Sequence, residues 1–259
     1  MKIVVCIKQV PDTREVSLDP ETNTLKREGV QSIMNPYDQH ALEEAVRLKE
    51  GYGAEVVALT MGPPQAEEVL RQAISCGADS GVLVSDRAFA GADTWATSYT
   101  LERALTRIGP FSLVLCGKQA IDGDTAQVGP GLAVRLGIPF VSCVQKIQEI
   151  NDREIVVERM MDDGYDIVAV EQPALLTVVK DINQPRVPSL KGKMKAKKAE
   201  IIRFSAEDIN ADPACLGLVG SPTRVVTVFP PPSRAKKVLL EGSIDQQVDL
   251  LVEQLAGYL

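Results

Sequence analysis

Histidine and closely spaced cysteines are almost missing from this chain. The sequence has one histidine, His40, and its five cysteines, at positions 6, 76, 116, 143 and 215, form no CxxC pair. Zinc sites and iron–sulfur clusters need several such ligands, so we expect no metal site within the chain. Scattered cysteines are typical of reduced thiols, which indicates a cytoplasmic protein. If the chain takes part in any redox reaction, the electron carrier must be an organic cofactor or another subunit.

Long apolar runs and an excess of positive charge are also lacking. Lys2 and Lys8 bracket the first apolar stretch, which is typical of a β-strand and not of a signal peptide. No window approaches the roughly 18 apolar residues that cross a bilayer. The net charge of −7 argues against general binding to nucleic acids or anionic membranes. We therefore expect a soluble protein with no membrane span and no nucleic-acid partner.

Apolar runs alternate with amphipathic stretches through the first half of the chain. Continuous apolar strands joined by such helices predict an α/β fold whose mostly parallel sheet is covered on both faces. Ligands of these sheets bind beyond the carboxyl ends of the strands, at a switch point in strand order. The pattern predicts strands at 3–10, 55–60, 80–84, 111–116 and 140–144, and helices at 38–50, 65–75, 94–108 and 125–136.

The second half has a different pattern. Alternating residues at 153–160 and 166–172 predict an antiparallel hairpin, and a further strand is expected at 174–180. Residues 184–193 show little periodicity. A proline-rich spacer at 229–233 precedes a helix predicted at 243–258, with Ser243 as its N-cap.

The segment 117–131 is rich in glycine, follows an apolar strand and opens a helix. Asp124 or Thr125 could cap that helix, whose free amides would attract an anion. The segment is neither a GxGxxG fingerprint nor a Walker A loop. As a pattern alone it fits a structural turn as well as a phosphate site.

As a string of residues the segment is far more specific. Gly117-Lys118-Gln119-Ala120-Ile121-Asp122-Gly123-Asp124 resembles the nucleotide loop of electron-transfer flavoprotein β subunits. Segments at 5–10, 34–38, 41–49, 60–63 and 194–198 match the same family in order, so the resemblance covers nearly the whole chain. It implies an adenine-nucleotide α-hydrolase-like (Rossmann-like) fold, and a subunit that pairs with an α subunit carrying a redox flavin.

The β subunits of this family hold AMP in simple electron carriers and a second FAD in electron-bifurcating proteins. The cofactor supplies the redox chemistry, so no residue is expected to be catalytic. By position, the resemblance implies nucleotide contacts from Cys6, Asn35, Pro36, Tyr37, Asp38, Met61, Gly117, Lys118, Gln119, Ala120, Ile121, Asp122, Gly123, Asp124, Thr125, Ala126, Gln127 and Val128. Cys6 could instead be a core residue, and Asn35 with Pro36 could form a turn that starts a helix.

Thr94 and Thr97 bear on the choice between FAD and AMP. They lie three apart at a predicted helix start, where hydroxyls could bind a flavin; alternatively, Asp93 or Thr94 only caps the helix. The Asp-Thr-x-x-Thr-Ser string resembles the bifurcating branch. This resemblance implies FAD that accepts a hydride from NADH and sends electrons to ferredoxin or flavodoxin and, through the α-subunit FAD, to an acyl-CoA dehydrogenase. The alternatives are a simple carrier subunit holding AMP and, more distantly, a nucleotide binder acting alone.

The resemblance also predicts how the chain is divided. Residues 1–232 would form the nucleotide-binding domain, including a partner-recognition loop at 184–198, and residues 233–259 an arm packing on the α subunit. Leu190 stands where the family inserts a leucine into the dehydrogenase. The lysines around it could steer that encounter or simply be a solvated face.

Overall fold

Short runs of branched aliphatic residues build the centre of a sheet. In the computed structural model, which describes residues 1–12, 17–18, 25–26, 31–227 and 239–257, five central strands are parallel and almost wholly buried. Branched side chains suit such strands because both faces are covered by helices. The five strands are β1 (Lys2–Cys6), β6 (Glu55–Met61), β7 (Ser80–Val84), β8 (Leu113–Gly117) and β12 (Ala174–Val178).

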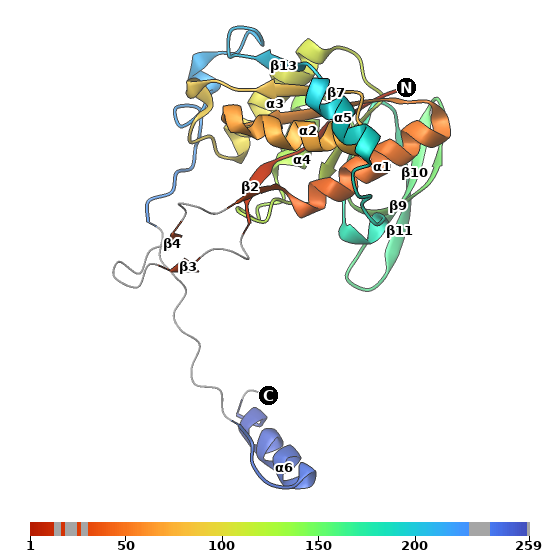
Figure 1. Cartoon of the computed structure of the whole chain (residues 1–259). Helices are drawn as coiled ribbons and strands as arrows, with labels where there is room; N and C mark the ends of the chain where they lie inside the picture. Colours follow the sequence, from red (N-terminus) through yellow and green to blue (C-terminus); the bar gives the residue numbers. More distant parts are fainter. Residues whose placement is uncertain (13–16, 19–24, 27–30, 228–238, 258–259) are drawn as a thin grey trace.

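Among the described residues the sheet has nine strands, in the order β11-β10-β9-β12-β8-β1-β6-β7-β13. Figure 1 labels its two edge strands, β11 and β13. β13 (Ile201–Phe204) adds one parallel edge strand. At the opposite edge, β9 (Phe140–Ile150) pairs antiparallel with β10 (Glu154–Met160), which pairs antiparallel with β11 (Tyr165–Glu171). The mostly parallel sheet and the antiparallel hairpin predicted from the sequence are both confirmed.

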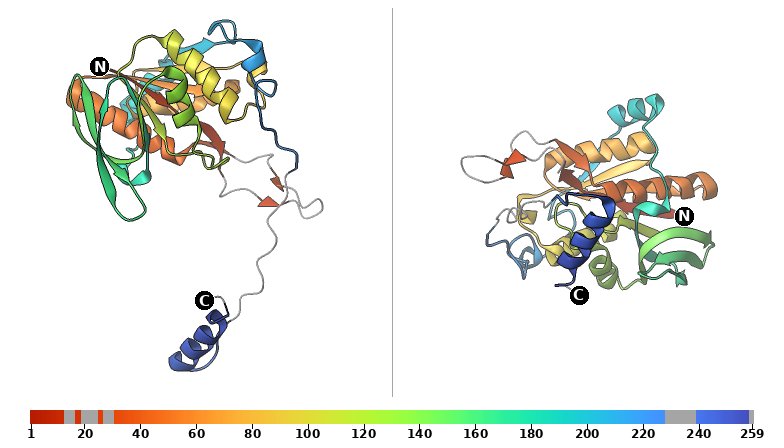
Figure 2. Two further views of the ribbon diagram at one scale, coloured as in Figure 1. Left: turned by 180° about the vertical axis from the view of Figure 1, so that it is seen from behind. Right: turned by 90° about the horizontal axis from the view of Figure 1, so that it is seen from below.

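Helices cover both faces of this sheet. α1 (Pro36–Tyr52) and α2 (Glu67–Cys76) pack on one face, and α3 (Thr94–Ile108) and α4 (Val128–Leu136) on the other, which faces the viewer in the left view of Figure 2. A buried apolar cluster lies on each face of the sheet, and adjacent residues of β1 contribute to both. Ile3 and Val5 belong to the cluster under α1 and α2, and Val4 belongs to the cluster under α3 and α4.

Smaller elements complete the described chain. α6 (Ile244–Leu255) lies apart from the sheet in Figure 1, and none of its residues is buried. Ser243 caps it as predicted, through a capping box with Gln246, whereas the proline spacer at 229–233 lies outside the described residues. The remaining elements are β2 (Gln9–Pro11), β3 (Ser17–Leu18), β4 (Leu25–Lys26), β5 (Ser32–Met34), α5 (Leu190–Lys198) and the short 3₁₀ helices η1 (Pro64–Ala66), η2 (Arg87–Phe89), η3 (Lys180–Ile182) and η4 (Pro213–Cys215).

Two expected strands differ from the structure by more than two residues at one end. The run 3–10 is not one strand: β1 ends at Cys6, because the Lys8 amide bonds to the Asp38 side chain, and β2 then pairs with β5 in a separate small sheet. The strand expected to end at 144 continues to Ile150, since β10 offers it a partner that the local pattern does not show.

The segment 184–198 was predicted as a loop, and that prediction is wrong for its second half. Residues 190–198 form α5, whose N-cap Ser189 accepts a hydrogen bond from the Gly192 amide. α5 packs against α2, as Figure 1 shows. Its helical pattern is hard to see in the sequence, because five of its nine residues are lysines and Ala196 is its one buried residue. The edge strand β13 was missed as well.

None of the helices in the described ranges is long and apolar enough to cross a membrane.

Gly129 makes the closest approach between α4 and the sheet, and replacing it with alanine should destabilise the fold. A Cβ at this position would lie 2.6 Å from the Thr177 methyl carbon on β12. Thr177 cannot turn away freely, because its hydroxyl accepts a hydrogen bond from the Cys143 amide. We expect a loss of about 1–3 kcal/mol in the free energy of unfolding, measured by urea denaturation. Gly164→Ala is the control, since nothing lies within 4 Å of its added Cβ; equal stability of the two variants would contradict the prediction.

Candidate functional site

The order of the strands defines a switch point at the carboxyl ends of β1 and β8. From β1 the chain moves outward through β6 and β7, then returns to β8 on the other side of β1. The connections that leave β1 and β8 therefore run to opposite sides of the sheet. Folds of this kind bind their ligands at such a point.

Asp38, in the first turn of α1, ties these two strand ends together. Its carboxylate accepts hydrogen bonds from the backbone amides of Lys8 (2.8 Å) and Gly117 (3.2 Å). A Cβ at Gly117 would lie 2.4 Å from the Asp38 carboxylate, so only glycine allows this approach. Burial raises the pKa of Asp38 to about 7, although the side chain of Asn35 and the two amides act in the opposite direction.

Asn35 precedes α1 and holds the loop that follows β8. Its side-chain amide donates to the Gln119 carbonyl (2.8 Å), and its side-chain oxygen accepts from the Ile121 amide (3.2 Å). Lys8 pairs with the Asp122 carboxylate at 2.7 Å, which adds a further tie to the same loop. Lys8 was missed as a site residue, because its charge alone does not show that Asp122, 114 positions later, would face it.

The loop 117–127 does not become helical where the sequence suggested. α4 begins at Val128, and neither Asp124 nor Thr125 caps it. Asp124 and Ala126 both have φ of 54°, which a right-handed helix cannot contain, so the helix expected from 125 starts three residues later. Within the part of the chain that the structure describes, none of the amides of residues 125–129 donates a hydrogen bond.

Those amides lie around the positive end of the α4 dipole, where hydrogen-bond donors without partners favour an anion. Gly123 is not required by the packing of the protein itself, since an added Cβ there would meet nothing within 4 Å. The protein's own packing therefore leaves open space beside Gly123.

The first turn of α3 reaches this loop. Thr94 Oγ1 donates to the Gln127 side-chain oxygen (3.1 Å), so the Thr94 hydroxyl already has a partner in the chain. The capping alternative holds for Asp93, whose carboxylate accepts from the amides of Trp95 and Ala96. Thr97 is half-buried one turn later on the same helix, and among the described residues its hydroxyl has no hydrogen bond.

The other expected residues lie at the same edge of the sheet. Cys6 ends β1 opposite Cys116 of β8, and Met61 ends the neighbouring strand β6; both Cys6 and Met61 are half-buried. Pro36 and Tyr37 open α1, with the Lys180 ammonium 4.8 Å from the centre of the Tyr37 ring. The structure thus gathers the expected nucleotide residues at one edge, with Thr94 and Thr97 on its flank. Leu190 lies elsewhere, on α5.

The comparisons with known proteins agree with this geometry. The electron transfer flavoprotein domain model matches residues 22–209. The electron transfer flavoprotein subunit beta of Thermoanaerobacterium thermosaccharolyticum is 50% identical over 256 residues, which cover 98% of each chain. Subunit CarD of the caffeyl-CoA reductase–Etf complex of Acetobacterium woodii is 49% identical over 249 residues, or 96% of this chain and 95% of CarD. Protein FixA of Bradyrhizobium diazoefficiens is 44% identical over 262 residues, or 98% and 91%.

The chain therefore belongs to the electron transfer flavoprotein family. Within that family it is a β subunit of an electron-transfer complex, which implies an α subunit as its partner. The switch-point residues fit a group with phosphates, because the unpaired amides at 125–129 supply donors at a helix start.

Asp38 should make stability depend on pH. The folded protein keeps the Asp38 proton up to about pH 7, while the unfolded chain loses it near the ordinary value of 3.8. The protonated carboxyl therefore contributes stability that is fully present below about pH 4 and is lost by about pH 7, on the order of 2–4 kcal/mol. The Asp38→Asn variant cannot titrate at this position. Its free energy of unfolding should therefore rise relative to that of the wild type between about pH 4 and pH 7, and the difference between the two proteins should stay constant at higher pH.

Urea denaturation of both proteins between pH 4 and 8, with a carboxyl carbon NMR titration of Asp38, measures this effect. Asn is a poorer acceptor for two amides, but that cost is the same at every pH. A pH-independent difference between the two proteins, or a carboxyl that titrates near pH 4, would contradict the prediction.

Proposed function

We propose that this β subunit holds FAD at the switch point between β1 and β8, as part of an electron-bifurcating heterodimer. The observation that carries the proposal is the run of unpaired amides at 125–129, placed where α4 begins and where Asp38 and Asn35 hold both flanking loops. This arrangement offers a rigid site for the phosphates of an adenine nucleotide. The residues expected from the sequence to contact the nucleotide, from Cys6 through Val128, are proposed to do so.

Each group of residues has its own task in this proposal. The amides of residues 125–129 bind phosphate. Asn35 holds the loop that follows β8, and Asp38 holds the ends of β1 and β8. Thr94 orients the loop through Gln127, while the Thr97 hydroxyl is free to bind the flavin part. These roles are binding and positioning; no side chain is assigned a proton-transfer step.

When bound, FAD would supply the redox chemistry, accepting electrons from NADH and sending them to ferredoxin or flavodoxin and, through the α-subunit FAD, to an acyl-CoA dehydrogenase. The relative CarD supports a partner of this type, since it belongs to a complex of an Etf with caffeyl-CoA reductase.

A simple carrier subunit that holds AMP is the second candidate. The bond from Thr94 to Gln127 favours it, because that hydroxyl needs no flavin to be satisfied. The two candidates share the phosphate site and differ in what lies against Thr97.

We also propose that residues 1–232 act as the nucleotide-binding domain and that residues 233–259 pack on the α subunit. The apolar side chains of α6 support this division, since Val248, Leu251 and Val252 are all exposed on a well-capped helix. A helix with this apolar surface gains stability by packing on another surface.

FAD content separates the two candidates. Acid release from the purified α/β heterodimer should give about two FAD per pair and almost no AMP, because the proposal places one FAD in each subunit to supply the redox chemistry. NADH alone should bleach the flavin absorbance. Thr97→Val, which keeps the side-chain volume and removes the hydroxyl, should lower FAD occupancy, whereas Thr106→Val at the far end of α3 is the matched control. One FAD and one AMP per pair, with no response to NADH, would establish the simple carrier instead.

Leu190 is proposed as the anchor for the dehydrogenase, because 83% of its surface is exposed at the start of α5. Leu190→Ala should raise the half-saturating dehydrogenase concentration about tenfold to a hundredfold, as expected for an anchor residue. Flavin content and NADH oxidation with an artificial acceptor should not change. Val219→Ala, at a similarly exposed position, is the control; if both variants behave as wild type in electron transfer, Leu190 is not the anchor.

A further inference from the structure

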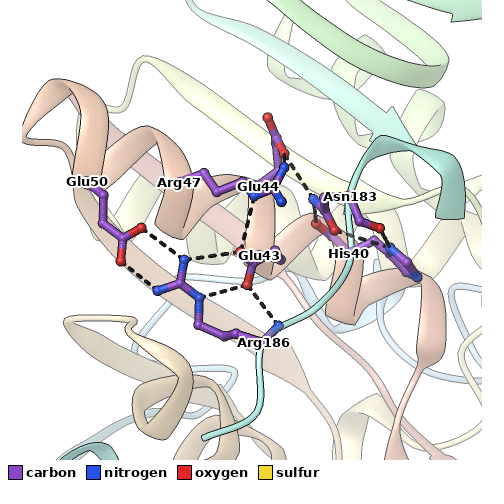
Figure 3. Close-up of polar contacts among 7 residues, drawn as sticks. All are labelled: His40, Glu43, Glu44, Arg47, Glu50, Asn183 and Arg186. Atoms are coloured by element: carbon purple, nitrogen blue, oxygen red, sulfur yellow. Dashed lines mark hydrogen bonds and ion pairs between the residues drawn. The ribbon is translucent and has the colours of Figure 1, made fainter. Parts of the chain in front are cut away.

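The connection between η3 and α5 is held against α1 by one arginine (Figure 3). The Arg186 guanidinium donates to both Glu43 oxygens (2.8 and 3.1 Å) and to both Glu50 oxygens (2.6 and 3.0 Å). Its backbone amide also donates to Glu43, at 3.1 Å. Two forked pairs on one guanidinium fix both the position and the orientation of this segment. Glu43, Glu50 and Arg186 are called the clasp below.

A second tie lies three residues earlier. The Asn183 side-chain amide donates to the His40 carbonyl and to the Glu44 carboxylate, both at 3.0 Å. The His40 ring nitrogen Nδ1 lies 3.0 Å from the Asn183 carbonyl. The role of His40 is therefore structural. Together, Asn183 and the clasp leave the segment little freedom before α5 begins.

The clasp is fully charged at neutral pH. Burial alone would raise the pKa of Glu43, but hydrogen bonds from Arg186 outweigh it and hold that pKa below its usual value. The same guanidinium lowers the pKa of Glu50. Glu43 is buried, so removing Arg186 would leave a carboxylate poorly neutralised, with Arg47, at 3.2 Å, as its one remaining ion-pair partner among the described residues.

The far end of α5 is fixed independently. Arg71 on α2 donates to the carbonyls of Ala196 (2.6 Å) and Ala199 (3.2 Å). Gly192 lies so close to α2 that an added Cβ would be 2.1 Å from the Ser75 carbonyl oxygen. With both ends held, the exposed side chains of Val187, Leu190 and Met194 point outward from a preformed surface.

We propose that the clasp is a positioning device for partner recognition: Arg186, bound to Glu43 and Glu50, preorganises the segment that presents Leu190. This inference rests on the proposed docking of the dehydrogenase at Leu190. The physical reason is entropic, because a segment already ordered before the encounter loses less freedom on binding. Breaking the clasp should therefore weaken docking although Arg186 itself need not touch the partner.

The test uses the complete α/β heterodimer with its flavins and an acyl-CoA dehydrogenase from the same organism. In Arg186→Gln, hydrogen exchange at 184–192 should become faster, and the half-saturating dehydrogenase concentration should rise roughly threefold to tenfold. The limiting rate, the flavin content and NADH oxidation with an artificial acceptor should stay as in the wild type. Arg47→Gln is the matched control, since Arg47 also pairs with Glu43 but, among the described residues, has no hydrogen bond or ion pair to the segment.

The outcomes separate this inference from the docking proposal. Arg186→Gln could accelerate hydrogen exchange but leave the half-saturating dehydrogenase concentration unchanged, while Leu190→Ala raises that concentration. That result overturns the inference, and docking at Leu190 stands. If Leu190→Ala itself has no effect, docking fails and the inference falls with it. Should Arg186→Gln not fold, Glu50→Gln removes one forked pair on the exposed side and should show both effects in smaller size; an unchanged Glu50→Gln would overturn the inference.

Discussion

The carboxyl ends of β1 and β8 separate at the centre of the sheet, and the backbone amides exposed there need acceptors. Asp38 provides them, with one carboxylate oxygen for the Lys8 amide and one for the Gly117 amide. This interaction ends both strands, sets the first turn of α1 and leaves the loop after β8 no room for a side chain at its first position. It forces a carboxyl group into the interior, which is the reason for its raised pKa.

α1 links the two functional regions that this constraint creates. Its first turn, with Asn35 and Asp38, organises the proposed nucleotide site. Its middle and end, with Glu43 and Glu50, hold the segment before α5. A single rigid helix thus carries both the site that would hold the cofactor and the support of the surface that would meet a partner, so their relative placement is fixed by one element.

Prediction from the sequence succeeded where the signal is local. The parallel strands have continuous apolar runs, the hairpin has alternating residues, and Ser243 is an N-cap residue placed directly before an apolar helical pattern. It failed where a distant partner decides the outcome. β13 is a strand because β7 offers it an open edge, and α5 is helical because α2 supports a segment whose five lysines give no apolar stripe. The start of α4 was misplaced, because Asp124 and Ala126 adopt left-handed conformations that the local sequence pattern does not show.

The sequence by itself determined the α/β class, the site loop after the fourth central strand and the family, since these depend on apolar periodicity and on a contiguous string of residues. Tertiary structure alone decided that Asp38 would be buried between two strand ends, that Lys8 would face Asp122, and that Arg186 would reach two glutamates more than 130 positions earlier. Such contacts join residues far apart in the chain. Their strength comes from burial and exact geometry, and neither property exists until the sheet and its helices have packed.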